Sequence, residues 1–406
     1  MVNSKAEGPA GPRGGLAAAP PDIAFAFDAD EGLWNDRAEP PVDEPVDTAA
    51  RSAELIQRIV REFTAVAPPG WQQLDALFTL SVGGGIVVAY FTDVQGNAVA
   101  VEPSAEAVEL AHQQRRLSAQ SADGPWWRML VRARPSDAWQ VEYDHGEEPF
   151  PEDQLFEPEA YRADLLAFPR QRLPVWLAAY IGHGGAQRRD PGRAAQGDAR
   201  KALPASGLPG LPGLWARWAL IAAAHVATGS EWGPRILPAL GWFEGNSGGG
   251  STLVLLPGGR AVLSGGTWDA PALEAAYNGG AQLPDLYAGA PDWLADPVLN
   301  QRAAKGLLSF CYWWDGAGWW HGASPDIAEI APAVPEVWTS AAVVDVVTAV
   351  LSERSTTACG RDIAELLVAA EAGTATRTAF AELLGNDPHG ALDDGYYQLL
   401  LAGVGK

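Results

Sequence analysis

The stretch ALFTLSVGGGIVVAYFTDVQGNAVAV, residues 76–101, decides the fold of the first half of this chain. It holds three runs rich in β-branched and apolar residues, at 76–82, 86–92 and 98–101, and such runs predict β-strands. A glycine triplet separates the first two runs, and residues 94–97 separate the next two. Because short glycine-containing connections are typical of hairpins, the three strands are expected to pair antiparallel.

The neighbouring sequence predicts helices that cover this sheet. Residues 51–63 place apolar side chains at three- and four-residue spacing, the pattern of an amphipathic helix that ends before Pro68. Further expected elements are a helix at 104–117, strands at 126–133 and 139–143, and helical segments near 161–166 and 174–181. Strands joined by short turns, with helices before and after them, predict an α+β domain over residues 51–183.

A second α+β domain is expected at 213–406, after a flexible linker at 184–212 that is rich in Gly, Pro and Ala. In it we expect a helix at 214–227, a hairpin at 252–256 and 261–263, strands at 307–314 and 319–321, and two or three helices near 337–351, 361–373 and 391–402. Its role is open. Residues 1–50 are acidic and rich in Pro and Gly, which predicts a disordered arm. Four apolar residues of the arm are candidates to dock: Ile23, Phe25, Phe27 and Trp34.

The negative net charge indicates which classes of partner this protein can bind. The chain has 50 acidic and 28 basic residues, a formal charge of −22. Such a surface repels phosphate backbones and anionic lipids, so we expect no nucleic acid and no membrane as partner. It attracts a basic protein, although an acidic surface also serves solubility alone.

Cysteine usage and the N-terminus favour a cytoplasmic protein. Cys311 and Cys359 are too few and too far apart for a disulfide framework. The first residues lack the apolar core of a signal peptide, and the longest apolar run, 218–226, is far too short to span a bilayer.

Catalytic patterns are weak throughout the sequence. The glycine runs at 83–85 and 245–250 lack the context of a phosphate-binding loop and are interpreted as turns. His145 and His321 are candidates for a general base, but the histidines and cysteines lack metal-ligand spacing. We therefore expect no catalytic residue, no metal and no cofactor.

The acidic loop EYDHGEEPFPEDQLFEPE, residues 142–159, is the candidate binding site. Prolines restrict it, and two phenylalanines beside carboxylates suggest an apolar anchor with a charged rim. The alternative is that both phenylalanines fold back into the core and the carboxylates are merely solvated. The predicted partner-binding residues are Asp144, Glu147, Glu148, Phe150, Glu152, Asp153 and Phe156.

Part of the first domain resembles a known family. The order of features over residues 55–181 is carried by APPGW at 67–71, GPWW at 124–127, WQVEYD at 139–144, PEAY at 158–161, FPR at 168–170 and PVWL at 174–177. This resembles bacterial immunity proteins of polymorphic toxin systems, in particular the YezG-like set and the immunity factor of the tuberculosis necrotizing toxin, an NAD glycohydrolase. The resemblance implies a domain that inhibits a toxin by occluding its active site.

The sequence thus predicts a non-catalytic immunity protein that binds a basic toxin domain. Two alternatives stay open. The carboxylates of the 142–159 loop, with tryptophans as sugar platforms, would suit a carbohydrate-active enzyme that uses paired carboxylates. The chain would otherwise be a structural scaffold protein. The identity of the toxin, the domain that contacts it and the oligomeric state are not fixed by the sequence.

Overall fold

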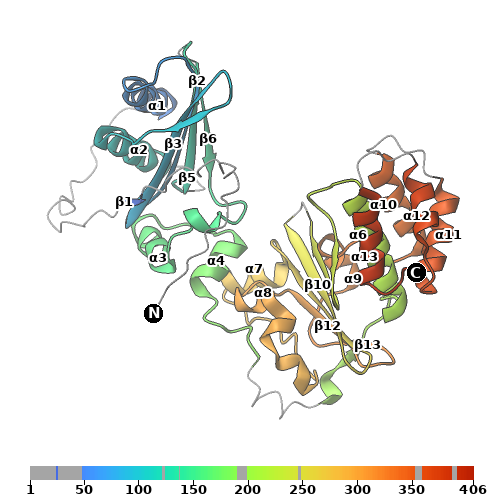
Figure 1. Ribbon diagram of the computed structural model, residues 1–406. Helices are drawn as coiled ribbons and strands as arrows, with labels where there is room; N and C mark the ends of the chain where they lie inside the picture. Colours follow the sequence, from blue (N-terminus) through green and yellow to red (C-terminus); the bar gives the residue numbers. More distant parts are fainter. Residues whose placement is uncertain are drawn as a thin grey trace, which may run out of the picture. The chain divides into compact units, whose positions relative to one another are not determined.

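The computed structural model describes residues 24–25, 48–120, 124–136, 138–189, 199–245, 248–352, 359–385 and 391–406 (Figure 1). The chain divides into two compact units, Met1–Gln171 and Arg172–Lys406. Each unit combines an antiparallel sheet with helices, so the predicted α+β class with two sheets is confirmed.

The first unit is organised around the predicted hairpin. Its strands are β1 (Ala24–Phe25), β2 (Trp71–Ser81), β3 (Gly84–Asp93), β4 (Ala98–Ala100), β5 (Arg128–Ala133) and β6 (Trp139–Asp144). The sheet order is β1-β3-β2-β5-β6, and β4 also pairs with β3. Asp93 closes the turn into β4, because its carboxylate accepts the backbone N–H groups of Gln95 and Asn97 at 2.8 and 2.9 Å. Hydrogen bonds from the Asn97 side chain and from these amides hold the pKa of Asp93 below its usual value.

Helices α1 (Thr48–Thr64) and α2 (Ala105–Ser118) cover one face of this sheet, and α3 (Pro158–Ala167) lies near one end of it (Figure 1). Ser104 starts α2, since its Oγ accepts the Ala107 N–H at 3.1 Å. Phe63 of α1 meets Phe78 of β2 edge to face. The buried side of α1 is the predicted stripe: Leu55, Ile56, Ile59, Val60 and Phe63.

A buried ion pair joins the segments of this unit. The Arg115 side chain is 3% exposed and that of Asp164 is fully buried, and their charged groups are 2.8 Å apart. The other oxygen of Asp164 accepts the Val82 N–H at 3.0 Å, in the turn between β2 and β3. Arg115 also donates to the carbonyl of Trp126 at 2.9 Å. One pair of side chains thus connects α2, α3, the β2–β3 turn and the residues that enter β5.

The second unit contains a seven-stranded sheet with the order β7-β13-β12-β11-β10-β9-β8. Its strands are β7 (Leu203–Pro204), β8 (Arg235–Leu237), β9 (Leu240–Glu244), β10 (Gly249–Leu256), β11 (Arg260–Thr267), β12 (Phe310–Trp314) and β13 (Trp319–His321). Its helices are α4 (Val175–Gly182), α6 (Leu211–Ala227), α7 (Pro271–Tyr277), α8 (Gln301–Ala304), α9 (Ile327–Ile330), α10 (Ser340–Ser352), α11 (Gly360–Glu371), α12 (Arg377–Leu384) and α13 (Ala391–Leu401).

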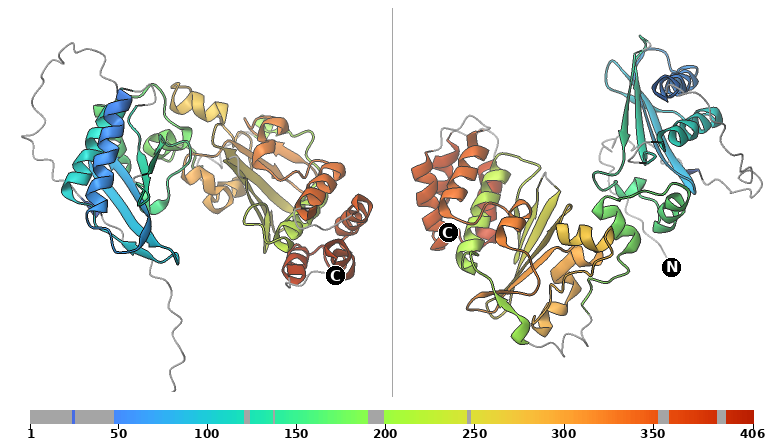
Figure 2. Two further views of the ribbon diagram at one scale, coloured as in Figure 1. Left: turned by 90° about the horizontal axis from the view of Figure 1, so that it is seen from above. Right: turned by 180° about the vertical axis from the view of Figure 1, so that it is seen from behind.

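Both faces of this second sheet are covered, as Figure 2 shows. Helix α6 lies on one face, with α10, α11 and α13 packed around it, and the Leu263 and Tyr312 side chains belong to this helical core. Val262 and Trp313 point to the other face, where they pack with Leu308 and neighbouring residues of the 286–308 segment. Because successive strand residues alternate between two covered faces, most residues of β10, β11 and β12 are buried, including the polar Ser251 and Ser264.

The two cysteines differ in their surroundings. Cys311, on β12, is buried, and its thiol donates a hydrogen bond to Asn300 Oδ1 at 3.4 Å. Burial raises the pKa of the Cys311 thiol to about 12. Cys359 is exposed at the start of α11.

The described parts of the 184–212 segment belong to the second unit. The Gln187 side chain exchanges hydrogen bonds with the backbone of Leu308, at 2.7 and 2.9 Å. Arg189 donates to the carbonyls of Ala290 and Pro291. Strand β7 pairs with β13 at the edge of the sheet. Composition alone predicted a flexible linker here. In the described residues 184–189 and 199–212, side-chain and backbone hydrogen bonds instead attach the segment to the second unit.

The division between the units also differs from the predicted one, falling after residue 171 rather than after 183. Helix α4 packs on α7 through Val175 and Leu273. The Leu173 backbone exchanges two hydrogen bonds with the Asn278 side chain, at 3.1 and 2.9 Å. The sequence prediction assigned α4 to the first domain because it preceded the proline- and glycine-rich segment.

Several elements have no counterpart in the sequence prediction, among them β1, β7 and α9. Further unpredicted elements lie in the second unit. These are strands β8 and β9, helix α12, and the short helices between β11 and β12. Most of the predicted arm lies outside the described residues. Of its described residues, 24–25 form β1, which pairs antiparallel with β3, and 48–50 begin α1. Among the described helices, none combines the length and apolar character needed to cross a membrane.

The division after residue 171 can be tested with three fragments. We expect fragments 1–171 and 172–406 to unfold cooperatively, each with the melting temperature of the corresponding transition of the full chain. A second-unit fragment that begins at residue 184 should melt several degrees lower, because it loses the Leu173–Asn278 hydrogen bonds and Val175. Equal melting temperatures of the two second-unit fragments would contradict the observed division.

Loss of the buried ion pair should destabilise the first unit strongly. In Asp164→Asn the shape is kept but Arg115 stays buried without a counter-charge, which costs about 3–5 kcal/mol. Urea denaturation followed by amide exchange in β2 and β5 measures this change. The control is Glu106→Gln, which breaks the exposed Arg58–Glu106 pair and should cost less than about 1 kcal/mol. Similar effects of the two substitutions would argue against a central role for Asp164.

Candidate functional site

The predicted binding loop connects the end of β6 to α3. Asp144 is the last residue of β6, and its Oδ1 accepts the Gly146 N–H at 2.7 Å, which turns the chain out of the sheet. Gly146 has a φ of 92°, a conformation that glycine adopts without strain. A single turn of 3-10 helix at Glu152–Gln154 follows, and Pro158 opens α3.

Asp144 forms an ion pair with a neighbouring strand. Its Oδ2 accepts two hydrogen bonds from the Arg128 guanidinium, one of them at 2.8 Å from Nε. Arg128 also donates to Gln154 Oε1 at 2.9 Å, so the same guanidinium holds the 3-10 turn of the loop. Both charged side chains are largely shielded, at 20% and 25% exposure. Asp144 therefore acts as a fixed support of the loop.

The two phenylalanines point inward. Phe150 is 5% exposed, and the Arg128 guanidinium lies over its ring, 4.8 Å from the ring centre. Phe156 is half-buried, 5.9 Å from the fully buried ring of Tyr161 in α3. The Tyr161 hydroxyl also accepts the Phe156 N–H at 3.3 Å. Of the two alternatives that the sequence left open, folding back into the core is the one that Phe150 adopts.

The remaining predicted carboxylates face solvent. They are Glu147, Glu148, Glu152 and Asp153, all exposed. Among the described residues, Glu147 is the one member of the four whose carboxylate accepts a hydrogen bond, from the His145 N–H at 3.2 Å. None of the four forms an ion pair with any described residue. The loop therefore presents four uncompensated negative charges on a backbone fixed by Arg128 and Tyr161.

The candidate histidines belong to different units, His145 to the first and His321 to the second. His145 is half-buried at the start of the loop, and His321 packs on Tyr312 with 5.2 Å between the ring centres. Hydrogen bonds between either imidazole and a carboxylate are absent among the described residues. Within the same described part of the chain, His, Cys, Asp and Glu side chains do not gather in groups of three that would hold a metal ion.

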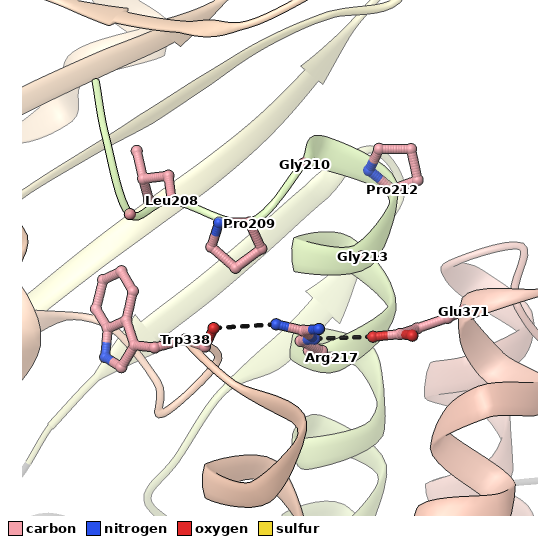
Figure 3. Close-up of a pocket in the computed structure, with 9 residues that line it drawn as sticks. Leu208, Pro209, Gly210, Pro212, Gly213, Arg217, Trp338 and Glu371 are labelled. Carbon is pink, nitrogen blue, oxygen red and sulfur yellow. Dashed lines mark hydrogen bonds and ion pairs between the residues drawn. The ribbon is translucent and has the colours of Figure 1, made fainter. Parts of the chain in front are cut away.

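A cavity of about 490 Å³ in the second unit was not predicted from the sequence (Figure 3). Leu208, Pro209 and Trp338 line one side of it, and Arg217 and Glu371 lie on the other. Arg217 Nε donates to Glu371 at 2.8 Å, and its Nη1 donates to the Val337 and Trp338 carbonyls. Because Arg217 binds its own chain through these groups, the cavity offers little free charge to a ligand.

No protein-family model matches this chain, and no curated protein matches its sequence. The resemblance of residues 55–181 to toxin-immunity proteins therefore stays a prediction.

Replacement of Phe150 should affect folding rather than binding. Because its ring is buried against Tyr161 and Arg128, Phe150→Ala is expected to lower the free energy of unfolding by about 3–5 kcal/mol. Denaturation by urea measures this, and the exposed neighbour Glu148→Ala serves as the control with little expected change. A Phe150→Ala protein of unchanged stability would indicate a ring that reaches solvent.

Proposed function

We propose that this protein is a non-catalytic inhibitor that binds a basic protein through the acidic loop at 142–159. The leading candidate for this partner is a toxin domain. One observation carries the proposal: Glu147, Glu148, Glu152 and Asp153 are all exposed and without ion-pair partners among the described residues. On a backbone held by Arg128 and Tyr161, these carboxylates form a localised negative surface with which a basic protein can pair.

Electrostatics supports fast association with such a partner. The net charge of −22 attracts a basic surface from a distance, and the four loop carboxylates concentrate that attraction at one place. Complementary charge raises association rates more than it raises intrinsic affinity. An inhibitor that must reach its toxin before the toxin reaches a target gains directly from a fast encounter.

The toxin as partner and the cytoplasm as location rest on the sequence. The resemblance of residues 55–181 favours toxins of the polymorphic type, including NAD glycohydrolases. Inhibition would then occur by occlusion, without chemistry on the part of this chain. A cytoplasmic location fits, because a toxin that enters or arises in the cell is met there.

Charge reversal of the loop tests the proposal. A pull-down from the native host with mass spectrometry identifies the partner. The quadruple variant Glu147→Lys, Glu148→Lys, Glu152→Lys and Asp153→Lys should then bind it more than about tenfold more weakly, because close charge pairs are lost and replaced by repulsion. Its melting temperature should stay nearly unchanged, since all four side chains are exposed. Association of the wild-type protein should slow as salt is raised, with screening over about 8 Å at physiological ionic strength.

A matched control separates local from overall charge. The exposed residues Glu336, Asp345, Glu365 and Glu382 of the second unit, likewise without ion pairs among the described residues, are changed to Lys. Each set of four reversals adds eight positive charges, taking −22 to −14. The control should slow association only modestly. Equal loss of binding by both variants would mean that net charge alone matters, and intact binding by the loop variant would move the interface elsewhere.

A further inference from the structure

Strand β6 forms an edge of the first sheet. It pairs with β5 from Arg128↔Asp144 to Ala133↔Trp139, and among the described residues it has no strand on its other side. The hydrogen bond from Arg134 N to Ala138 O sets the alternation. In an antiparallel pair, every second residue of a strand directs its backbone N–H and C=O toward the partner strand. Counting from Ala138, Gln140 and Glu142 therefore direct these groups toward β5. The backbone N–H and C=O groups of Trp139, Val141 and Tyr143 consequently point outward.

The strands at the other sheet edges, β1, β4, β7 and β8, are only two or three residues long, and β7 and β8 are partly blocked as well. The outer edge of β3 carries β1 and β4. In the second unit, β7 ends in Pro204, which has no N–H to offer, and the Ile236 N–H of β8 is taken by the Gln398 side chain at 2.6 Å. Strand β6 is longer than β7 or β8 and has no proline or lysine. Among the described residues no strand pairs with its outward side, so β6 offers a template for a further strand.

The edge is also held in place from behind. Tyr143 Oη accepts a hydrogen bond from Gln114 Nε2 at 2.7 Å and lies 3.3 Å from Ser52 Oγ, so α1 and α2 both fix this strand. The Trp126 indole in turn donates to the Gln114 carbonyl. A fixed strand loses little conformational entropy when another strand pairs with it.

We propose that an extended, basic segment of the partner protein adds to the outer edge of β6 as a new strand, with its positive charges next to the loop that follows. This inference rests on the proposed function and specifies how the partner is recognised. Backbone hydrogen bonds to Trp139, Val141 and Tyr143 would give the affinity, and pairing with the loop carboxylates would select basic sequences.

Charge distinguishes this occupant from two others within the protein itself. Residues 1–50 hold 10 acidic and 3 basic residues, a net charge of −7. A second copy of the chain brings −22. Both would approach an edge that continues directly into four uncompensated carboxylates, and like charges repel. A basic segment is the occupant that this surface attracts.

Amide hydrogen exchange of the full-length protein, resolved by residue, tests the proposal with synthetic peptides as probes. In the free protein, the outward amides of Trp139, Val141 and Tyr143 should exchange fast, while those of Gln140 and Glu142 should be protected. A peptide that alternates lysine and valine should slow only the outward amides, by at least about threefold. Two peptides are matched controls: an N-methylated copy that keeps the charges, and an analogue with glutamate in place of lysine. Neither should protect them.

Each other outcome overturns the proposal. Protection of the outward amides in the free protein would mean that the edge is already occupied. If deletion of residues 1–47 then makes these amides exchange fast, the occupant is that segment. If dilution makes them exchange fast, the occupant is a second copy of the chain. Equal protection by the lysine and glutamate peptides would remove the selection by charge. Absence of protection by the lysine peptide would reject strand addition, while the pull-down and loop reversal decide the proposed function independently.

Variants of the chain give a second readout. Val141→Pro removes one outward N–H. Val141→Ala keeps this N–H and shortens the side chain, so it controls for the loss of the valine side chain. We expect peptide protection of Trp139 and Tyr143 to be lost in the proline variant and retained in the alanine variant. Melting curves show whether both variants fold. A folded proline variant that is still protected by the peptide would overturn the pairing.

Discussion

The ion pair between Arg115 and Asp164 is the constraint on which the first unit depends. A buried charge is tolerable only when it is paired and its remaining hydrogen-bonding groups are satisfied. Here Asp164 accepts from Arg115 and from the Val82 backbone, and Arg115 also reaches the Trp126 carbonyl. The same guanidinium lies over the rings of Trp127 and Phe168. Because α3 is held at this point and β6 at the sheet, both ends of the acidic loop have fixed positions.

The sequence predicted those elements whose pattern is local. The alternation in β2 and β3, the glycines between them and the stripe on α1 depend on neighbours within a few residues, and these predictions are confirmed. Strands β8 and β9 contain only three and five residues, too few for a period to be visible. The hydrogen bonds of Gln187 and Leu173 join residues about a hundred positions apart, which no local pattern can reveal.

In the candidate site, too, the sequence predicted the features that depend on single residues and missed those that depend on distant contacts. Exposure of the four loop carboxylates follows from their chemistry, because an unpaired charge stays in water. The position of Phe150 depends instead on Arg128 and Tyr161, and the sequence around the loop does not specify these contacts. Asp144 was expected at the binding surface for its charge, but a cross-strand arginine engages it. Within this loop, the sequence predicted the exposure of the unpaired carboxylates, but it did not predict the contacts that bury Phe150 and engage Asp144.

The contrast between the two cysteines determines how this chain responds to oxidants. The thiolate is the reactive form, and burial keeps Cys311 protonated at physiological pH. Cys359 alone is open to reagents. Oxidation can therefore join two chains through Cys359, or cap that residue with a small thiol, while a bond between the chain's own two sulfurs would require Cys311 to leave the core. The molecule has a single addressable thiol, far in sequence from the proposed binding loop.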